Sequence, residues 1–183
     1  MLKKIIGNQN GIAPTEQIRE VEKLYKNKEF DEALEIALEV IQKYPKTIII
    51  QNILGIIFFN QNNLNLSLHH FREVLKIDSS NSNAYNNIGI CLIEMKNYKD
   101  AIKILEYALL NNKKAPEVFN NIGIAYEKLE DYENSIIHYK KAISQKQNYA
   151  EAYNNLGSLL QKMKEYTKAE KFLNYAIKFD PKL

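Results

Sequence analysis

The feature that most constrains the fold of this chain is a period of 34 residues. The segment YNNIG at residues 85–89 returns as FNNIG at 119–123 and as YNNLG at 153–157. Aligning the glycines needs no insertion and leaves residues 1–13 as a leader. The remainder divides into five repeats, 14–47, 48–81, 82–115, 116–149 and 150–183. A fixed period of this length is typical of arrays in which each repeat stacks on its neighbours.

The pattern inside each repeat predicts two helices. With the residues of a repeat numbered 1 to 34, apolar or small residues recur at positions 4, 7, 8 and 11 and again at 20, 21, 24, 27 and 28. At 100° per residue, each set falls on one face of a helix. Position 8 is glycine in four repeats, and position 20 is alanine or serine in all five. Small residues at these two positions predict a close approach of the two helices.

These positions closely resemble the tetratricopeptide repeat, which has an aromatic residue at 4, Leu-Gly at 7–8, alanine at 20 and 27, and proline at 32. The last repeat matches best, through Tyr153, Leu156, Gly157, Ala169, Ala176 and Pro181. The resemblance covers residues 14–183 and implies an all-α fold, a right-handed α-solenoid of antiparallel helix pairs. The first repeat departs from it, with Gln17, Glu20 and Val21 at positions 4, 7 and 8, and is expected to form a looser cap.

The balance of charge argues against several classes of partner. The chain has 25 lysines and arginines against 22 aspartates and glutamates, and they are interspersed. Without a basic stripe we expect no nucleic-acid partner, which also argues against RNA-binding pentatricopeptide repeats. The most apolar segment, residues 48–59, is too short to cross a membrane and is predicted to be a buried helix. We therefore expect no membrane insertion. A single cysteine, Cys91, cannot form an intramolecular disulfide, which favours a cytoplasmic protein.

The residue types that carry catalysis or bind metals are few and poorly spaced. Adjacent His69 and His70 would diverge by about 100° on a helix, and His138 lies two repeats later. Cys91 is next but one to Gly89 and is interpreted as a buried, inert thiol. No phosphate-binding loop or catalytic acid pair is apparent. We therefore predict no enzymatic activity, no cofactor and no metal site.

The resemblance implies a peptide-binding site on the first helix of each repeat. In tetratricopeptide proteins, positions 2, 5, 6, 9, 12 and 13 line a concave groove that holds partner peptides. Here position 6 is Asn87, Asn121 and Asn155 in successive repeats. These amides resemble the asparagine ladder of O-linked N-acetylglucosamine transferases and would pair with the backbone of an extended peptide. The alternative is consensus drift, because asparagine is abundant throughout the chain. The asparagines at position 5 are interpreted as filler.

Two further sets of residues are predicted to line this groove. The first is apolar and would bind an apolar partner segment, unless it packs against neighbouring repeats instead: Ile56, Phe59, Ile90, Ile93 and Ile124. The second is acidic: Glu117, Glu127 and Glu151.

From these patterns we expect a protein–protein interaction scaffold that binds a partner peptide or helix in the groove. Two alternatives remain open. The chain could be the N-terminal, acceptor-recruiting module of a larger glycosyltransferase or sulfotransferase. It could also self-assemble as a homo-oligomer through the face of its C-terminal helix, where Ile177 and Phe179 are apolar.

Overall fold

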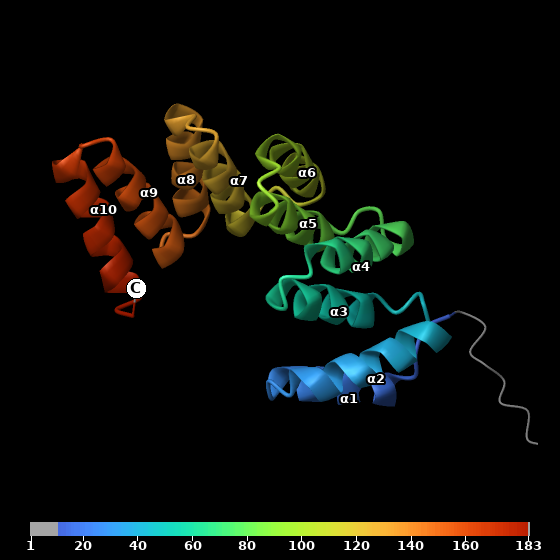
Figure 1. Cartoon of the computed structure of the whole chain (residues 1–183). Coiled ribbons are helices and arrows are strands. Elements are labelled where there is room, and N and C mark those ends of the chain that lie inside the picture. Colours follow the sequence, from blue (N-terminus) through green and yellow to red (C-terminus); the bar gives the residue numbers. More distant parts are fainter. Residues whose placement is uncertain (1–10, 183) are drawn as a thin grey trace, which may run out of the picture. The chain divides into compact units, whose positions relative to one another are not determined.

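The helices of the chain follow the 34-residue period. The computed structural model describes residues 11–182, and within them it contains ten helices and no strand (Figure 1). First helices occupy positions 1–13 of each repeat and second helices positions 17–30, except that the first one begins a residue later. The helices are α1 (Thr15–Lys26), α2 (Phe30–Lys43), α3 (Ile48–Asn60), α4 (Leu64–Ile77), α5 (Ser82–Glu94), α6 (Tyr98–Asn111), α7 (Pro116–Lys128), α8 (Tyr132–Gln145), α9 (Ala150–Lys162) and α10 (Tyr166–Phe179).

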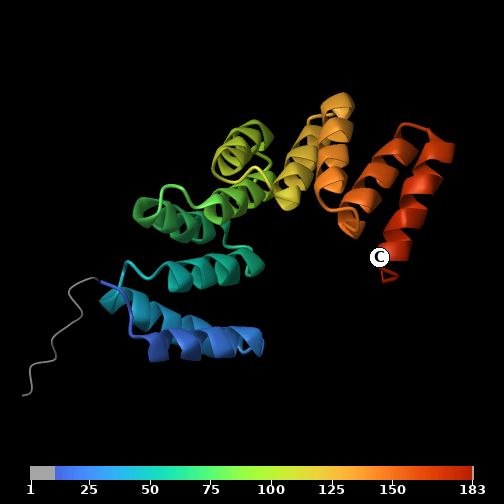
Figure 2. The ribbon, with the colours of Figure 1, turned by 180° about the vertical axis from the view of Figure 1, so that it is seen from behind.

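The chain forms two compact halves, residues 1–91 and 92–183, which we call the N-terminal and C-terminal halves. Within each half, the two helices of a repeat run antiparallel and side by side, as α3 does with α4 and α9 with α10 (Figure 1 and Figure 2). The all-α fold of paired helices predicted from the sequence is therefore confirmed.

Each pair of helices is joined by the same tight turn. The residue at position 15 has a positive φ in every repeat, although none of the five is glycine. In the second repeat, the backbone N–H groups of Asn62 and Asn63 donate to the carbonyls of Phe59 and Phe58, at 2.9 and 2.8 Å. This is the Schellman pattern that ends a helix through a left-handed residue. The left-handed residues are Lys28, Asn62, Lys96, Glu130 and Lys164.

The glycines at position 8 make room for a large side chain at position 24 of the same repeat. A Cβ atom added to Gly55 would lie 2.5 Å from the ring of Phe71, and one added to Gly123 would lie 2.6 Å from the ring of Tyr139. Both rings are fully buried. Glycine is therefore required at these positions by close packing rather than by backbone conformation.

The first repeat reverses this arrangement of sizes. Val21 stands at position 8 and Ala37 at position 24, and both side chains are completely buried in the core of the N-terminal half. A larger residue at position 8 is thus accompanied by a smaller one at position 24. The departure of this repeat from the consensus is matched within the same helix pair.

Serine at position 20 adds a hydrogen bond to this close contact. The hydroxyl groups of Ser67 and Ser135 donate to the carbonyls of Gly55 and Gly123, each at 2.8 Å. The Ser67 hydroxyl also lies 3.2 Å from the sulfur of Cys91, whose side chain is fully buried, as predicted.

The apolar segment at residues 48–59 forms α3, and its buried side chains include Ile50, Leu54 and Ile57. The prediction of a buried helix is confirmed. Among the described residues, no helix combines the length and the apolar character needed to span a membrane.

Candidate peptide-binding site

Four of the predicted groove residues surround one cavity in the N-terminal half. Ile56 and Phe59 come from α3, and Asn87 and Ile90 come from α5. The cavity has a volume of about 190 Å³, and Asn87 is the one polar residue among those that line it. An apolar cavity of about 150 Å³ can hold a benzene ring. This one therefore has room for a single leucine, isoleucine or phenylalanine side chain.

The fifth residue that lines the cavity, Phe71, was missed by the sequence reasoning. It lies on α4, a second helix, whereas only first helices were expected to line a groove. Its ring reaches the cavity because Gly55 has no side chain to block it. The signal in the sequence was a bulky residue at position 24 opposite a glycine at position 8.

Two side-chain amides on α3 and α5 lack hydrogen-bond partners among the described residues. The Asn87 side chain is half-buried, and no hydrogen bond joins it to another described residue. The side-chain oxygen of Asn52, 35 residues earlier on α3, is buried and also lacks a partner among the described residues. A buried amide without a partner is destabilising.

In the C-terminal half, the asparagines at the corresponding two positions are hydrogen-bonded to each other. Asn120 and Asn155 are also 35 residues apart, and the amide of Asn155 donates to the Asn120 oxygen at 3.0 Å. The amide of Asn120 donates to the Glu151 carboxylate at 3.1 Å, and its side chain is completely buried. Asn120 therefore ties α7 to α9, and its interpretation as filler is wrong. The reason is that a position-5 amide meets the position-6 amide of the following repeat.

Two of the predicted acidic residues are held by tyrosines. The Tyr139 hydroxyl donates to Glu127 at 2.9 Å, and the Tyr149 hydroxyl donates to Glu151 at 3.3 Å. Burial, and next the neighbouring carboxylates, raise the pKa of both phenols well above the usual range. The hydroxyl groups therefore stay protonated and keep Glu127 and Glu151 in place as acceptors.

The remaining predicted residues are not among those that line the cavity. Ile124 packs against the core of the C-terminal half, which is the structural alternative considered for it. Glu117 is exposed and lies 3.6 Å from the ammonium group of Lys146. Asn121, on α7, and Ile93, on α5, are half-buried.

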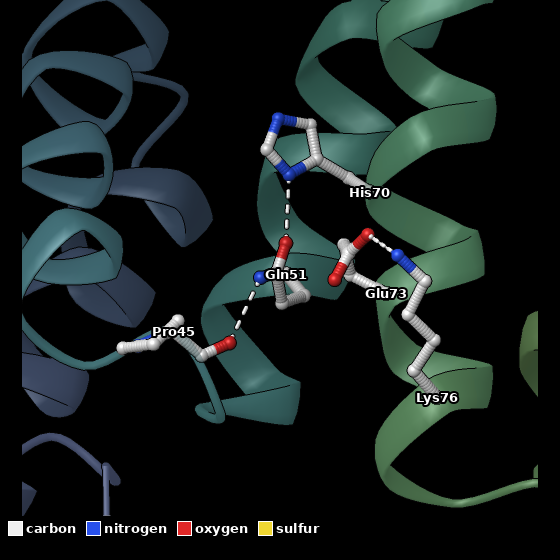
Figure 3. A network of polar contacts seen from close by, with 5 residues as sticks. All are labelled: Pro45, Gln51, His70, Glu73 and Lys76. Atoms are coloured by element: carbon white, nitrogen blue, oxygen red, sulfur yellow. Dashed lines mark hydrogen bonds and ion pairs between the residues drawn. The ribbon is translucent and has the colours of Figure 1, made fainter.

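A hydrogen-bonded chain of polar residues fixes α3 against α4 in the N-terminal half (Figure 3). Gln51 occupies position 4, where the tetratricopeptide pattern has an aromatic residue. Its amide donates to the carbonyl of Pro45 at 3.0 Å, so its oxygen faces His70 Nδ1 at 2.7 Å. Because an amide oxygen only accepts, Nδ1 carries the proton and donates.

His70 is held neutral by its surroundings. The ring is 7% exposed and stacks on Phe58, with 5.4 Å between the ring centroids. Burial, and next the electrostatic effect of the neighbouring His69, lower the pKa of His70 to about 4 against the opposing effect of Glu73. His70 therefore acts as a structural residue of the helix pair. No cluster of metal-binding side chains occurs among residues 11–182.

Comparison with known proteins agrees with this geometry. A family model for the N-terminal tetratricopeptide (TPR) repeat region of Psidin matches residues 16–139, which is more than half of the chain. A second model, for the tetratricopeptide repeat itself, matches residues 114–182. The chain is a tetratricopeptide repeat protein. Cell division cycle protein 27 homolog B from Arabidopsis thaliana is 35% identical over 63 residues. That match spans 34% of this TPR protein and 8% of the plant protein.

Solved structures of other TPR proteins share the fold. PilF of Pseudomonas aeruginosa superposes with a TM-score of 0.79 at 20% identity, over 90% of this chain and 75% of PilF. MamA of Desulfovibrio magneticus, from residue 41 to its end, has a TM-score of 0.78 at 18% identity, over 96% of this chain and 98% of MamA. YrrB has a TM-score of 0.68 at 17% identity, over 91% of this chain and 86% of YrrB. These similarities confirm the predicted α-solenoid of helix pairs.

Proposed function

We propose that this TPR protein is an interaction scaffold that captures an extended segment of a partner protein over the cavity of the N-terminal half. The observation that carries the proposal is the open cavity bordered by Ile56, Phe59 and Ile90 on the same face as the amide of Asn87. YrrB, one of the structural neighbours, is described as a TPR protein with an unusual peptide-binding site, which supports a binding role for this fold.

The mechanism divides recognition between the apolar walls and the amide. One large apolar side chain of the partner enters the cavity, and complete burial of such a side chain contributes roughly 1.5–3 kcal/mol. Asn87 offers a carbonyl acceptor and two N–H donors, so it can pair with the N–H and C=O groups of the partner backbone. The cavity then selects the side chain, while the amide accepts any sequence beside it.

In the C-terminal half, the proposal extends to the predicted acidic residues. Glu127 and Glu151 are oriented by tyrosine hydroxyl groups and would bind basic residues of the partner. For Asn121 and Asn155, peptide binding stays a prediction, and one donor of Asn155 already serves Asn120.

Selection from a random peptide library displayed on phage, with the full chain immobilised, tests this proposal. We expect enriched peptides to share one large aliphatic or aromatic residue. Phe59→Asp should weaken their binding roughly ten- to a hundredfold, the equivalent of losing one buried side chain. Leu110→Asp is the matched control, because Leu110 is 72% exposed on α6 and does not line the cavity. Equal affinity of the enriched peptides for both variants would contradict the proposal.

A further inference from the structure

The exposed face of the last helix is basic. At 100° per residue, α10 presents four exposed side chains within an arc of about 80°: Lys168, Lys171, Tyr175 and Lys178. The lysines are interspersed in the sequence, but their spacing of three and seven residues gathers them on one side of the helix. Lys171 and Lys178 form no ion pair with another described residue. We call these four residues the basic face of α10, a helix whose net charge is +2 from three lysines and one glutamate.

The second helix of the first repeat is acidic on the corresponding face. Positions 19, 22 and 26, which in the last repeat belong to the basic face, are carboxylates in α2: Glu32, Glu35 and Glu39. All three are exposed, and no ion pair joins them to another described residue. In α4, α6 and α8, the same three positions carry at most one acidic residue and one lysine. We call the three carboxylates the acidic face of α2, a helix whose net charge is −3 from four acidic residues and one lysine.

The two faces match in spacing when the helices run antiparallel. From Glu32, the next carboxylates of the acidic face follow after three and four residues. From Lys178 back toward the start of α10, Tyr175 and Lys171 follow at the same intervals. At 1.5 Å per residue, the outer members of each set are about 10.5 Å apart along their helix. Each carboxylate of α2 then meets a hydrogen-bond donor of α10: Glu32 meets Lys178, Glu35 meets Tyr175, and Glu39 meets Lys171.

This complementarity identifies a second copy of the chain as the occupant of the basic face. We propose that the basic face of α10 in one copy binds the acidic face of α2 in another. The contact joins two different surfaces and is therefore heterologous, so a further copy can add at each end. Tyr175 adds apolar area, because it is 37% exposed and stacks on Phe179 with 6.2 Å between the ring centroids. Phe179, predicted to take part in self-association, thus borders the basic face, whereas Ile177 lies on another side of the helix.

The contact between copies uses other residues than the proposed peptide site. No residue of either face is among those that line the cavity of the N-terminal half. Associated copies therefore present several cavities together, and a partner with more than one apolar segment would bind them with avidity. The inference does not depend on the proposed function.

Charge reversal tests the contact by sedimentation velocity of the full chain. The first variant, Glu32→Lys with Glu39→Lys, has two basic faces, and the second, Lys171→Glu with Lys178→Glu, has two acidic ones. Each should lower the association constant roughly tenfold, because two of the opposed pairs become repulsive. An equimolar mixture should regain association, because α10 of the first variant meets α2 of the second. Exposed ion pairs contribute little each, so protein concentrations up to about 1 mM are needed, and raising the salt should weaken the contact.

A matched control separates the two faces from net charge alone. Glu94→Lys with Glu133→Lys changes the net charge as the first variant does, at exposed positions of α5 and α8 outside both faces, and should leave association unchanged. An equal loss in this control would overturn the proposal. So would a wild-type chain that stays monomeric at low salt, or a mixture of the two variants that does not associate.

Peptide selection distinguishes failure of this inference from failure of the proposed function. The first variant should enrich the same peptides as the wild type, because its substitutions do not touch the cavity lining. Association of copies without peptide enrichment refutes the scaffold function alone. Peptide enrichment without association refutes the contact between α2 and α10 alone.

Discussion

The same substitution at the same repeat position is expected to have opposite effects on stability. Asn87→Ala removes an amide that bonds to no other described residue, whereas Asn155→Ala removes the donor that satisfies Asn120. Because Asn120 is completely buried, its oxygen would be left without water as well as without a partner. The pair therefore compares a structural amide with one that is available for a ligand.

The magnitudes follow from two opposing effects. An unsatisfied buried acceptor costs about 1–3 kcal/mol, and replacing asparagine by alanine inside a helix contributes about 0.6 kcal/mol. Asn155→Ala should then lower the free energy of unfolding by about 0.5–2.5 kcal/mol. Asn87→Ala should raise it by about 0.6 kcal/mol. At roughly 2–4 °C per kcal/mol for a chain of this size, the midpoint of thermal unfolding should fall by about 1–10 °C for Asn155→Ala and rise by about 1–2 °C for Asn87→Ala.

Urea unfolding followed by circular dichroism at 222 nm measures both changes. Asn87→Ala should also weaken peptides selected on the wild type by roughly two- to tenfold, the contribution of one hydrogen bond. If both variants shift stability in the same direction, the assignment of Asn155 to structure and of Asn87 to ligand binding is refuted.

Three further predictions concern the packing, the buried histidine and the turns. Gly123→Ala should lower the free energy of unfolding by about 1–3 kcal/mol through contact with the Tyr139 ring, less the roughly 1 kcal/mol that alanine gains in helix propensity. A variant that is more stable than the wild type in urea titration would contradict the close packing of Gly123 on Tyr139. In the folded chain the pKa of His70 is lowered from 6.5 to about 4. As the pH falls, the unfolded chain therefore binds the proton first. The contribution of His70 to stability is complete above pH 6.5 and is lost as the pH falls toward 4. Between pH 7 and 5 this residue should cost about 2 kcal/mol, a loss that His70→Phe should remove when unfolding is measured at both pH values. Lys96→Gly should raise the free energy of unfolding by about 0.5–1 kcal/mol, because it relieves the strain of a left-handed residue by more than the entropic cost of glycine, and the melting temperature should rise with it. Asn62→Gly should stabilise less, because asparagine tolerates this conformation.

The sequence predicted the helix pairs well because their signals are local. Period, small residues at positions 8 and 20, and the apolar faces all lie within one repeat, so each repeat independently supports the same two helices. The same was true of Cys91, which is buried beside Ser67 as its position next to the close-packing glycine indicated.

The candidate site was harder to predict because it depends on neighbouring repeats. Ile56 and Ile124 occupy the same position, yet Ile56 borders the cavity and Ile124 packs against the core. The role of Asn120 likewise follows from Asn155 in the next repeat. The pattern within one repeat contains neither fact, because the side chains of the neighbouring helices decide which residues stay accessible and which are packed or hydrogen-bonded.

The matched sizes at positions 8 and 24 bear on how such a chain can change by recombination between its repeats. An exchange of whole repeats keeps Val21 with Ala37 and Gly55 with Phe71, because both members of each pair travel together. A crossover inside the turn separates them. One product would force valine against the Phe71 ring, where even a single Cβ atom would lie at 2.5 Å, and the reciprocal product would leave a void between glycine and alanine. The heritable unit that preserves this fold is therefore the complete helix pair, and hybrids joined at residues 47 and 48 should fold where hybrids joined within a turn should not.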